Sequence, residues 1–268
     1  MPEISVIITT YNRAQLLEQA IESVLAQSYK NFEVIVVDDG SEDETSRIVK
    51  RFKVKYIFQK NSGISKARNT GVEFSKGRLI AFLDSDDLWK PEKLKIQKKF
   101  MDENPHIPLC YTDEIWLKGR VLKNQKKIHQ KFGGDIFERS LKLCIISPSS
   151  VMIRREIFEE FKFDEKLPVC EDYDLWLRIC AKYEVGYIPQ KLIIKRSICE
   201  QLSKKYKAMD RFRIYAIRKI LKTHISFKKR RLALEELRTK CRIVANGALK
   251  RGKFFRFLKY KLIPLLAK

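Results

Sequence analysis

Short apolar runs with strand character alternate with helix-like segments over the first 84 residues, and this alternation restricts the fold more than any other feature of the sequence. The runs are rich in β-branched and aromatic residues, and the segments between them carry apolar residues at helical spacing. Strands that alternate with helices predict a Rossmann-like α/β fold, a mainly parallel sheet with helices on both faces. The expected strands are 4–11, 32–39, 54–59 and 78–84, and the expected helices are 15–28, 41–52 and 63–75.

Polar and acidic residues stand where three of these apolar runs end. They are Thr9, Thr10 and Tyr11 after the first run, Asp38 and Asp39 after the second, and Asp84, Asp86 and Asp87 at the fourth. In an open parallel sheet the carboxyl ends of the strands form one edge, where ligands bind. We therefore expect these residues to converge in space although they are far apart in sequence.

The rest of the chain divides by regularity and by charge. Residues 105–195 are less regular, with strand candidates at 109–117 and 149–158 and an amphipathic helix at 171–183. Residues 204–268 are helical in pattern and contain 22 Lys or Arg against three acids, whereas the preceding part carries 34 bases and 30 acids. The net charge of +23 thus belongs mainly to a basic extension, which weakens a nucleic-acid-binding interpretation of the whole protein.

Cysteine spacing and hydropathy indicate the compartment. The six cysteines form no C-x-x-C pair, which argues against a zinc ribbon, a redox motif and a disulfide framework. The first residues carry Glu3 and lack the basic start of a signal peptide. No run reaches the roughly 18 to 20 apolar residues that cross a membrane. We expect a cytoplasmic protein with reduced thiols.

The acidic end of the fourth run predicts a cation site. Asp84 and Asp86 are two residues apart, so in extended geometry both side chains lie on one side of the chain. Carboxylates this close repel one another, and a divalent cation shared with a diphosphate would relieve the repulsion. The alternatives are that Asp87 caps a helix that begins near Pro91, or that the acids occupy an open turn.

The acidic end of the second run allows two interpretations. Asp39 or Ser41 could cap the following helix, and the acids after Gly40 suit a helix N-terminus. Asp38 and Asp39, however, follow apolar residues at the binding edge, where a carboxylate accepts hydrogen bonds from a nucleoside. The glycine fingerprint G-x-G-x-x-G is absent after the first run, which disfavours a dinucleotide-dependent enzyme.

Six segments, in this order and spacing, resemble glycosyltransferase family 2 over about residues 3–200. They are SVIITTYNR, QSYKNFEVIVVDDGSEDET, NSGISKARNTG, GRLIAFLDSDDLWKPEKL, SSVMIRREIFEE and CEDYDLWLR. The resemblance implies the GT-A fold and an inverting enzyme that transfers a sugar from a nucleoside diphosphate donor to an acceptor hydroxyl. It also implies Mg²⁺ or Mn²⁺ as a cofactor.

The same resemblance implies a role for individual positions in donor binding. Thr9 and Tyr11 would line the nucleoside pocket, and Asp39 would recognise the base, with uridine as the expected nucleoside. Arg68 would lie near the donor phosphates, where a guanidinium suits an anionic group. Asp84 and Asp86 match the D-x-D motif of the family, with Asp86 as the direct metal ligand.

The acid pair in CEDYDLWLR matches the position of the family's catalytic base. The resemblance implies that Asp172 is the general base and that Glu171 stands beside it. The alternative from the residues alone is an acidic first turn of a helix. Two departures affect this region: FKFDEKLPVCED replaces the usual Gly-Gly-Phe-Asp-Glu, and IIKRSICEQLS lacks a histidine that can complete the metal site. Cys199, Glu200 or water could take that histidine's place.

The basic extension has three interpretations. Aromatic and apolar residues recur among its bases at helical spacing, notably around Phe254 and Phe255, as in a helix that lies on anionic lipid. It could instead pack on the preceding domain with a solvated basic face, and this alternative stays open. RNA binding is disfavoured because no nucleic-acid-binding module accompanies the charge.

These observations predict a metal-dependent inverting glycosyltransferase that uses a UDP-sugar and a glycan or lipid-linked acceptor in the assembly of cell-surface polysaccharide or glycolipid. The expected domains are a GT-A domain at 1–203, with a nucleotide-binding half (1–104) and an acceptor-binding half (105–203), and a basic helical extension at 204–268. It would act in the cytoplasm or at the cytoplasmic face of the inner membrane. The rival functions are a non-catalytic GT-A relative, a protein whose basic tail binds nucleic acid, and a nucleotidyltransferase, for which the chain lacks a Gly-rich N-terminal loop.

Overall fold

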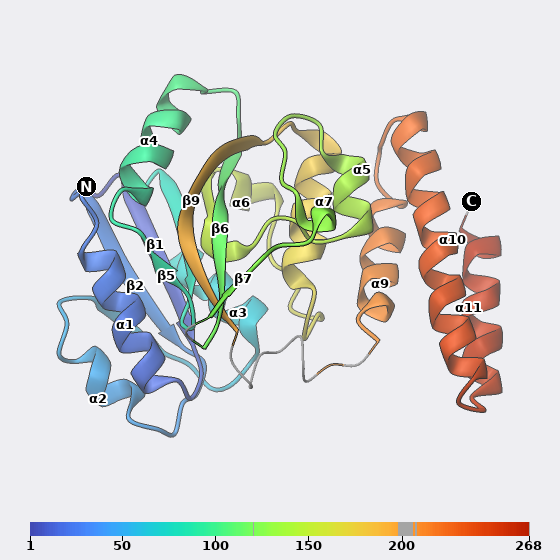
Figure 1. Cartoon of the computed structure of the whole chain (residues 1–268), viewed down its shortest axis with the longest axis horizontal. Helices are drawn as coiled ribbons and strands as arrows, with labels where there is room; N and C mark the ends of the chain where they lie inside the picture. Colours follow the sequence, from blue (N-terminus) through green and yellow to red (C-terminus); the bar gives the residue numbers. More distant parts are fainter. Residues whose placement is uncertain (120, 198–205, 207, 268) are drawn as a thin grey trace.

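A computed structural model describes residues 1–119, 121–197, 206 and 208–267 of the chain. The described strands form one sheet in the order β3-β2-β1-β4-β8-β6-β9-β5, and β7 pairs with β6 beside this path (Figure 1). The strands are β1 (Ile4–Thr10), β2 (Phe32–Asp38), β3 (Lys55–Phe58), β4 (Leu79–Asp84), β5 (Leu88–Trp89), β6 (Leu109–Lys118), β7 (Val121–Lys123), β8 (Val151–Arg154) and β9 (Gly186–Ser197).

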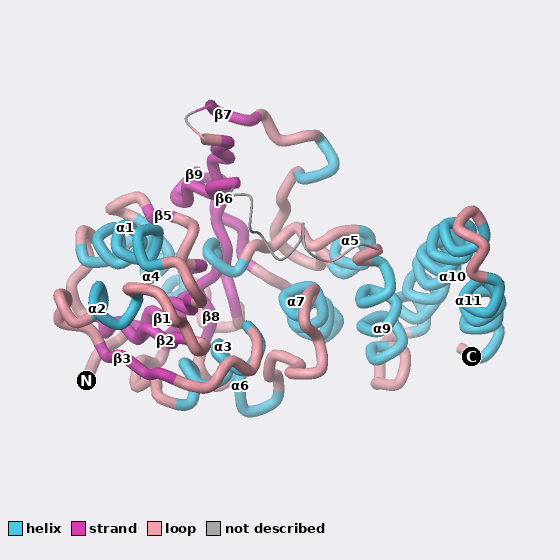
Figure 2. The backbone as a smooth tube through the Cα atoms, turned by 90° about the horizontal axis from the view of Figure 1, so that it is seen from below, coloured by secondary structure: helices cyan, strands magenta, loops and turns pink. Residues whose placement is uncertain are grey.

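Helices lie on both faces of this sheet and beyond its end. They are α1 (Ala14–Leu25), α2 (Thr45–Val49), α3 (Ile64–Glu73), α4 (Lys93–Glu103), α5 (Phe137–Lys142), α6 (Ile157–Glu160), α7 (Glu171–Lys182), α9 (Asp210–Ile220), α10 (Phe227–Leu249) and α11 (Phe254–Leu266), with 3₁₀ turns η1 (Lys127–His129) and η2 (Pro148–Ser150). Figure 2 shows α1 and α4 on one side of the sheet and α3 and α6 on the other. The prediction of an α/β sheet covered on both faces is therefore confirmed.

The first half of the sheet is parallel and buried. β1 lies between β2 and β4, and Ile4 pairs with Phe32 on one side and with Leu79 on the other. Its residues alternate between faces: Ile7 packs in the core under α3 and α6, and Val6 packs in the core under α1 and α4. Because both faces are covered, the sequence of β1 reads as a continuous apolar run.

The second half of the sheet contains the connections that position the site. β8 is antiparallel to both β4 and β6, whereas β9 runs parallel to β6. The two-residue strand β5 pairs with β9, Leu88 opposite Ile194 and Trp89 opposite Ile193. This pairing holds the chain that leaves the acidic end of β4 against the last third of β9.

The carboxyl-terminal helices share a core with the preceding domain. Ile214 and Ile217 of α9 and Leu237 of α10 pack in one cluster with Tyr173 and Leu177 of α7. The α10–α11 pair lies at the end of the molecule away from β3 (Figure 2). The prediction that the basic extension is helical is confirmed for the described residues. The expected boundary between 203 and 204 lies outside the described residues, so the division into domains stays a prediction.

One lysine is buried in the core below α4. The side chain of Lys93 is fully buried, and its Nζ donates a 2.5 Å hydrogen bond to Gln97 Oε1 and lies 3.9 Å from the centroid of the Trp89 ring. Burial lowers the pKa of Lys93 from 10.5 to about 7, because the charged form loses its hydration. Neutral Lys93 is therefore the form that the fold favours.

This lysine predicts a pH dependence of stability. Between about pH 7 and 10.5 the unfolded chain holds a proton on Lys93 that the folded chain lacks, so the free energy of unfolding rises with pH by at most about 1.4 kcal/mol per pH unit. The free energy of unfolding of the wild type and of Lys93→Met can be measured by urea titration between about pH 7 and 9. The wild-type value minus the Lys93→Met value should increase as the pH rises.

The matched control for this prediction is Lys95→Met, whose side chain is 68% exposed on the same helix. The difference between its free energy of unfolding and that of the wild type should stay constant over that pH range. A constant difference for Lys93→Met as well would show that Lys93 keeps its proton in the folded protein.

Candidate active site

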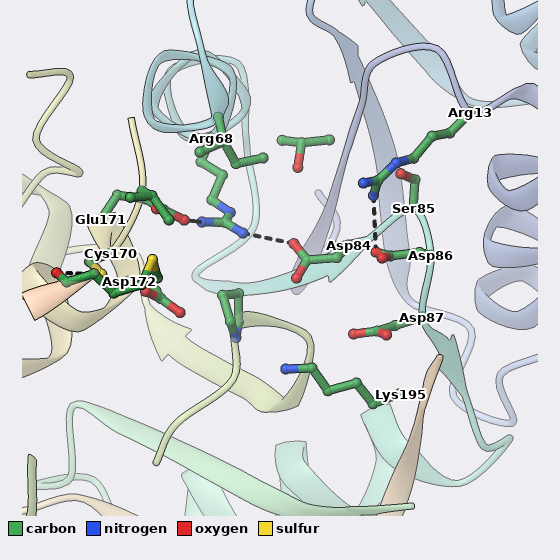
Figure 3. Close-up of a pocket in the computed structure, with 15 residues that line it drawn as sticks. Arg13, Arg68, Asp84, Ser85, Asp86, Asp87, Cys170, Glu171, Asp172 and Lys195 are labelled. Carbon is green, nitrogen blue, oxygen red and sulfur yellow. Dashed lines mark hydrogen bonds and ion pairs between the residues drawn. The ribbon is translucent and has the colours of Figure 1, made fainter. Parts of the chain in front are cut away.

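A cavity of about 210 Å³ lies at the carboxyl ends of β1 and β4 (Figure 3). Thr9, next to the last residue of β1, is paired with Asp84, the last residue of β4, in the register of the parallel sheet. The cavity is lined by Thr9, Arg13, Ile64, Arg68, Asp84, Ser85, Asp86, Asp87, Pro148, Val169, Cys170, Glu171, Asp172, Lys195 and Met209. Six of the eight residues that the sequence analysis assigned to the site thus meet here: Thr9, Arg68, Asp84, Asp86, Glu171 and Asp172.

A buried guanidinium joins the two acidic regions of the cavity. Nη2 of Arg68 lies 2.7 Å from Oδ1 of Asp84, and Nη1 lies 2.6 Å from Oε1 of Glu171. Burial lowers the pKa of Arg68, but the two carboxylates outweigh this effect and raise it, so the side chain stays charged. Arg68 therefore ties the end of β4 to the start of α7, which are separated by almost ninety residues of chain.

The two carboxylates of the D-x-D segment face the same cavity (Figure 3). β4 ends at Asp84, and the amide N–H of Asp87 donates to the carbonyl oxygen of Asp84 at 2.9 Å, so a turn rather than an extended strand brings Asp84 and Asp86 together. Burial and the charge of Asp84 raise the pKa of Asp86. Arg13 lies 3.2 Å from Oδ1 of Asp86 and compensates part of its charge.

Asp87 anchors this turn. Its Oδ2 accepts a 2.7 Å hydrogen bond from the hydroxyl of Ser149, and its Oδ1 accepts a 3.2 Å bond from the main-chain N–H of Arg196. Burial raises the pKa of Asp87 to about 8. The N-cap of α4 is Glu92, without a side-chain cap. The alternative that Asp87 caps the helix after Pro91 is therefore wrong, because the carboxylate is buried against η2 and β9 instead.

The acid pair of the second half opens α7. Glu171 is buried against Arg68, and burial together with the neighbouring charge of Asp172 raises its pKa to about 7. The main-chain N–H of Tyr173 donates to Oδ1 of Asp172 at 2.7 Å, and Figure 3 shows this carboxylate pointing into the cavity. Both acids do lie in the first turn of the helix, as the alternative interpretation expected, and they face the cavity as well.

Two of the residues assigned from the sequence lie outside the cavity lining. Tyr11 is 48% exposed. Oδ1 of Asp39 accepts hydrogen bonds from Gln59 and from the N–H of Ser62, and Oδ2 accepts one from the N–H of Gly63. Asp39 thus orders the loop before α3, and recognition of a base by Asp39 or Tyr11 stays a prediction.

Neither Asp39 nor Ser41 caps the helix after β2. The N-cap of α2 is Glu44, and Oδ1 of Asp43 accepts a 3.1 Å hydrogen bond from the N–H of Thr45, so the acids after Gly40 do stand at the start of this helix. The hydroxyl of Ser41 instead accepts a hydrogen bond from the N–H of Asn12, and Oδ1 of Asp38 accepts one from the N–H of Ser41. The segment after β2 is therefore folded against the loop that follows β1.

Two cations of the site, Arg13 and Lys195, were not predicted from the sequence. Arg13 follows Tyr11 by two residues in a segment already assigned to the binding edge, so its position was the available signal. Lys195 had no such signal, because it reaches the cavity only through the pairing of β9 with β5. Burial lowers the pKa of Lys195, but the carboxylates of Glu114, Asp87, Asp84 and Asp172 outweigh it and raise the pKa.

The donor set of the cavity fits a hard divalent cation. Asp84 and Asp86 present carboxylate oxygens, the ligands that Mg²⁺ and Mn²⁺ prefer, and burial together with the charge of Asp84 raises the pKa of Asp86. No group of three or more His, Cys, Asp or Glu side chains suited to a metal occurs in the described part of the chain. Substrate phosphates and water usually supply further ligands to Mg²⁺. Cys199 and Glu200, which the sequence suggested as ligands, lie outside the described residues.

Comparison with known families identifies the family of the chain. The profile of Glycosyl transferase family 2 matches residues 5–162. The chain belongs to this family. An uncharacterised glycosyltransferase of Rickettsia felis is 39% identical over 197 residues, which cover 71% of this chain. The chain spans about a third of the length of that relative, the match covering 32% of it.

A second relative has a specific name. The UDP-Glc:alpha-D-GlcNAc-diphosphoundecaprenol beta-1,3-glucosyltransferase WfaP of Escherichia coli is 35% identical over 188 residues, which cover 68% of this chain and 72% of WfaP. The family and its transferase class are therefore shown by sequence, whereas the substrates named for WfaP belong to that protein.

Solved structures show that the family member described here has the GT-A fold. Residues 1–349 of TarS from S. aureus, in complex with UDP-GlcNAc, superpose with a TM-score of 0.79 at 21% identity, covering 100% of this chain and 81% of that one. The mannosyltransferase PcManGT from Pyrobaculum calidifontis, in complex with GDP-Man and Mn²⁺, has a TM-score of 0.65 at 16% identity and covers 99% of this chain and 86% of that one. The predicted fold class is thus confirmed.

The Arg68 bridge predicts a large loss of stability when it is removed. Arg68→Met leaves the buried Glu171 and the partly exposed Asp84 without this partner and should lower the free energy of unfolding by about 3–5 kcal/mol in urea titrations. Lys66→Met on the same helix removes a partly exposed ion pair to Glu165 at 3.8 Å and should cost about 1 kcal/mol or less.

A rescue variant separates charge from packing. Adding Glu171→Gln to Arg68→Met removes one of the unpaired charges and should recover part of the lost stability. If Arg68→Met costs no more than Lys66→Met, the guanidinium does not hold the two acidic regions together.

Proposed function

We propose that the chain is an inverting glycosyltransferase that moves a sugar from a UDP-sugar to an acceptor hydroxyl. The observation that carries this proposal is the single cavity in which the Asp84–Asp86 pair and the Glu171–Asp172 pair face one another with Arg68 between them. One acid pair suits a metal-bound diphosphate and the other suits a proton acceptor. The names of WfaP and TarS–UDP-GlcNAc support a UDP-sugar as the donor class.

The reaction requires few chemical groups from the protein. Asp172 accepts the proton of the acceptor hydroxyl while the oxygen of that hydroxyl forms a bond to the anomeric carbon. The bond from the anomeric carbon to the diphosphate breaks on the opposite side, which inverts the configuration. Glu171 is held by Arg68 and keeps the start of α7 in place. Holding both substrates in line supplies a large share of the acceleration.

The donor end of the cavity is built to offset negative charge. Asp84 and Asp86 would hold a Mg²⁺ or Mn²⁺ ion, whose chemistry there is to neutralise the departing diphosphate. The Mn²⁺ in the PcManGT complex supports this assignment. Arg13 and Lys195 line the same cavity and place two further cations near the leaving group. Thr9 at the end of β1 would contact the nucleoside.

The proposed roles predict different defects for the two acid pairs. With a panel of UDP-sugars and Mn²⁺, Asp172→Asn should retain donor binding in calorimetry but lose about 10²–10⁴-fold in transfer or donor hydrolysis, since it removes the base alone. Asp86→Ala should abolish the rise in melting temperature that Mn²⁺ and UDP together give the wild type, because it removes a cation ligand.

One control accompanies these variants. Asp102→Asn alters an exposed ion pair with Lys98 on α4 and should leave both readouts unchanged. Failure of every UDP-sugar to bind the wild type, with no effect of Asp86→Ala, would overturn the enzyme assignment in favour of a non-catalytic member of the family.

The exposed apolar side of α11 suggests that the protein binds its acceptor at a membrane surface. Tyr260 and Ile263 of α11 pack in the helical core, while the opposite side is apolar and exposed; Phe255 is 92% exposed. We call this side the α11 face, and it consists of Phe254, Phe255, Leu258, Leu262, Leu265 and Leu266. Lys253, Arg256, Lys259 and Lys261 flank it along the chain. None of the helices in the described part of the chain has the length and apolar character needed to cross a bilayer.

The combination of apolar residues and bases fits the surface of an anionic membrane, where an amphipathic helix buries its apolar side and its bases meet lipid phosphates. We therefore infer peripheral attachment through the α11 face, at the cytoplasmic face of the inner membrane. This position suits a lipid-linked or membrane-assembled glycan acceptor, such as the diphosphoundecaprenol acceptor in the name of WfaP.

Vesicle binding tests the α11 face. Phe255→Asp combined with Leu258→Asp should weaken binding to phosphatidylcholine–phosphatidylglycerol vesicles about tenfold or more, since each buried apolar side chain contributes roughly 1.5–3 kcal/mol. The control is Phe58→Asp, which changes a phenylalanine that is 60% exposed on β3, at the other end of the molecule.

Two outcomes would count against this attachment. Equal vesicle binding by the wild type and the double variant would exclude the α11 face from the membrane contact. A wild-type dimer that the double variant converts to a monomer in sedimentation would assign the face to a second copy of the chain.

A further inference from the structure

A second cavity of about 400 Å³ opens beside the first and shares Asp172 and Lys195 with it. Its remaining walls come from β6, β7, β9, the segment after η1, and residues 144–147. This volume lies within the range of small-molecule sites, roughly 300–1,000 Å³. Because the proposed base faces both spaces, a molecule in the second cavity would present its groups directly to Asp172.

The second cavity has an excess of positive charge. Its lining contains four lysine or arginine residues, Lys123, Lys131, Lys195 and Arg196, against two acids, Glu114 and Asp172. Lys131 and Glu114 form a buried ion pair at 2.9 Å, so their charges offset one another. The guanidinium of Arg196 bonds to the carbonyl oxygen of Asp86 at 2.5 Å. The lining cations left for a ligand are Lys123 and Lys195.

These two lysines differ in position. The ammonium groups of Lys123 and Lys195 form no hydrogen bond or ion pair with any described residue. Four carboxylates attract the charge of Lys195 from a longer distance. Figure 3 shows Lys195 reaching from β9 into the cavity that Asp84, Asp87 and Asp172 line. Lys123 belongs to the β6–β7 hairpin and lines the second cavity but not the first. An anion bound between Lys123 and Lys195 would lie beside Asp172, outside the Asp84–Asp86 end of the first cavity.

The wall of the second cavity also offers an aromatic ring. The indole N–H of Trp116 donates a 2.6 Å hydrogen bond to Oε1 of Glu114, and the ring lies 4.9 Å from that of His129, centroid to centroid. The orientation of Trp116 is therefore held by the same glutamate that pairs with Lys131. A flat, oriented indole suits the C–H face of a sugar ring, as aromatic side chains do in many ligand sites.

Resting on the proposed function, we propose that the second cavity binds the acceptor and that the acceptor is a sugar phosphate. Its phosphate contacts Lys195 and Lys123, its ring packs on Trp116, and its hydroxyl faces Asp172. Lys195 then lies between the phosphate of the acceptor and the diphosphate of the donor. The shared chemistry, a sugar bearing a phosphate, covers both a soluble sugar phosphate and one that is linked to a lipid.

The test uses the protein with UDP and Mn²⁺ already bound, so that the first cavity is filled. Calorimetric titrations with N-acetylglucosamine 1-phosphate, glucose 1-phosphate, their methyl glycosides and inorganic phosphate compare the contributions of charge and ring. We expect at least one sugar phosphate to bind about tenfold or more tightly than both its methyl glycoside and inorganic phosphate, and added salt to reduce the difference.

Two variants locate the binding. Lys123→Glu should weaken binding of the sugar phosphate about tenfold and leave the methyl glycoside unchanged. Lys118→Glu makes the same change on the same hairpin, outside the cavity lining, and should alter neither. A sugar diphosphate with a short alkyl chain identifies the source: tighter binding than the soluble sugar phosphate assigns the site to a lipid-linked acceptor, and equal binding to a soluble one.

The outcomes separate this proposal from the proposed function. If UDP and Mn²⁺ bind but methyl glycosides bind as tightly as sugar phosphates, the acceptor assignment fails while the donor site stands. Equal losses for Lys123→Glu and Lys118→Glu would reduce the effect to general surface charge and overturn the site. Failure of UDP and Mn²⁺ to bind at all would overturn the proposed function itself.

Discussion

The site depends on one buried cation held between two acids from different halves of the chain. Arg68 contributes the guanidinium, Asp84 ends β4, and Glu171 begins α7. A buried charge without partners costs several kcal/mol, so each member needs the others. The bridge also sets the spacing between a pair of acids suited to a metal and diphosphate and a pair suited to proton transfer. Its importance is therefore positional as much as energetic.

Strand pairing at the far side of the sheet completes the surroundings of these acids. β5 contains only two residues, yet its pairing with β9 holds the turn after β4 beside Lys195 and Arg196. Ser149 closes the same turn from η2, because its hydroxyl donates to Asp87 and accepts from the main-chain N–H of Asp84. The acidic turn is thus held by main-chain, hydroxyl and guanidinium groups, and the carboxylates of Asp84 and Asp86, which pair with Arg68 and Arg13, line the cavity.

Charge within the molecule follows two patterns with different consequences. In the cavity, acids and bases are interleaved at contact distance, as in the pairs Arg13–Asp86 and Arg68–Asp84, so a ligand must exchange partners with groups that are already paired. In the carboxyl-terminal helices the bases greatly outnumber the acids, and the apolar α11 face lies among them. The first pattern suits a phosphate-bearing substrate with its cation, and the second suits an extended anionic surface.

The sequence by itself determined the elements of the parallel half and the place of their acidic ends, because a buried parallel strand needs a continuous apolar run and its carboxyl end faces the binding edge. Thr9, Asp84 and Asp86 consequently line one cavity, where they meet Arg68, Glu171 and Asp172, which the family resemblance assigned. Only the tertiary structure decided that Asp87 binds Ser149 rather than capping α4, that Asp39 orders a loop, and that Lys195 lies between two cavities. These contacts join residues far apart in the chain, and they depend on strand pairing and packing that no local pattern encodes.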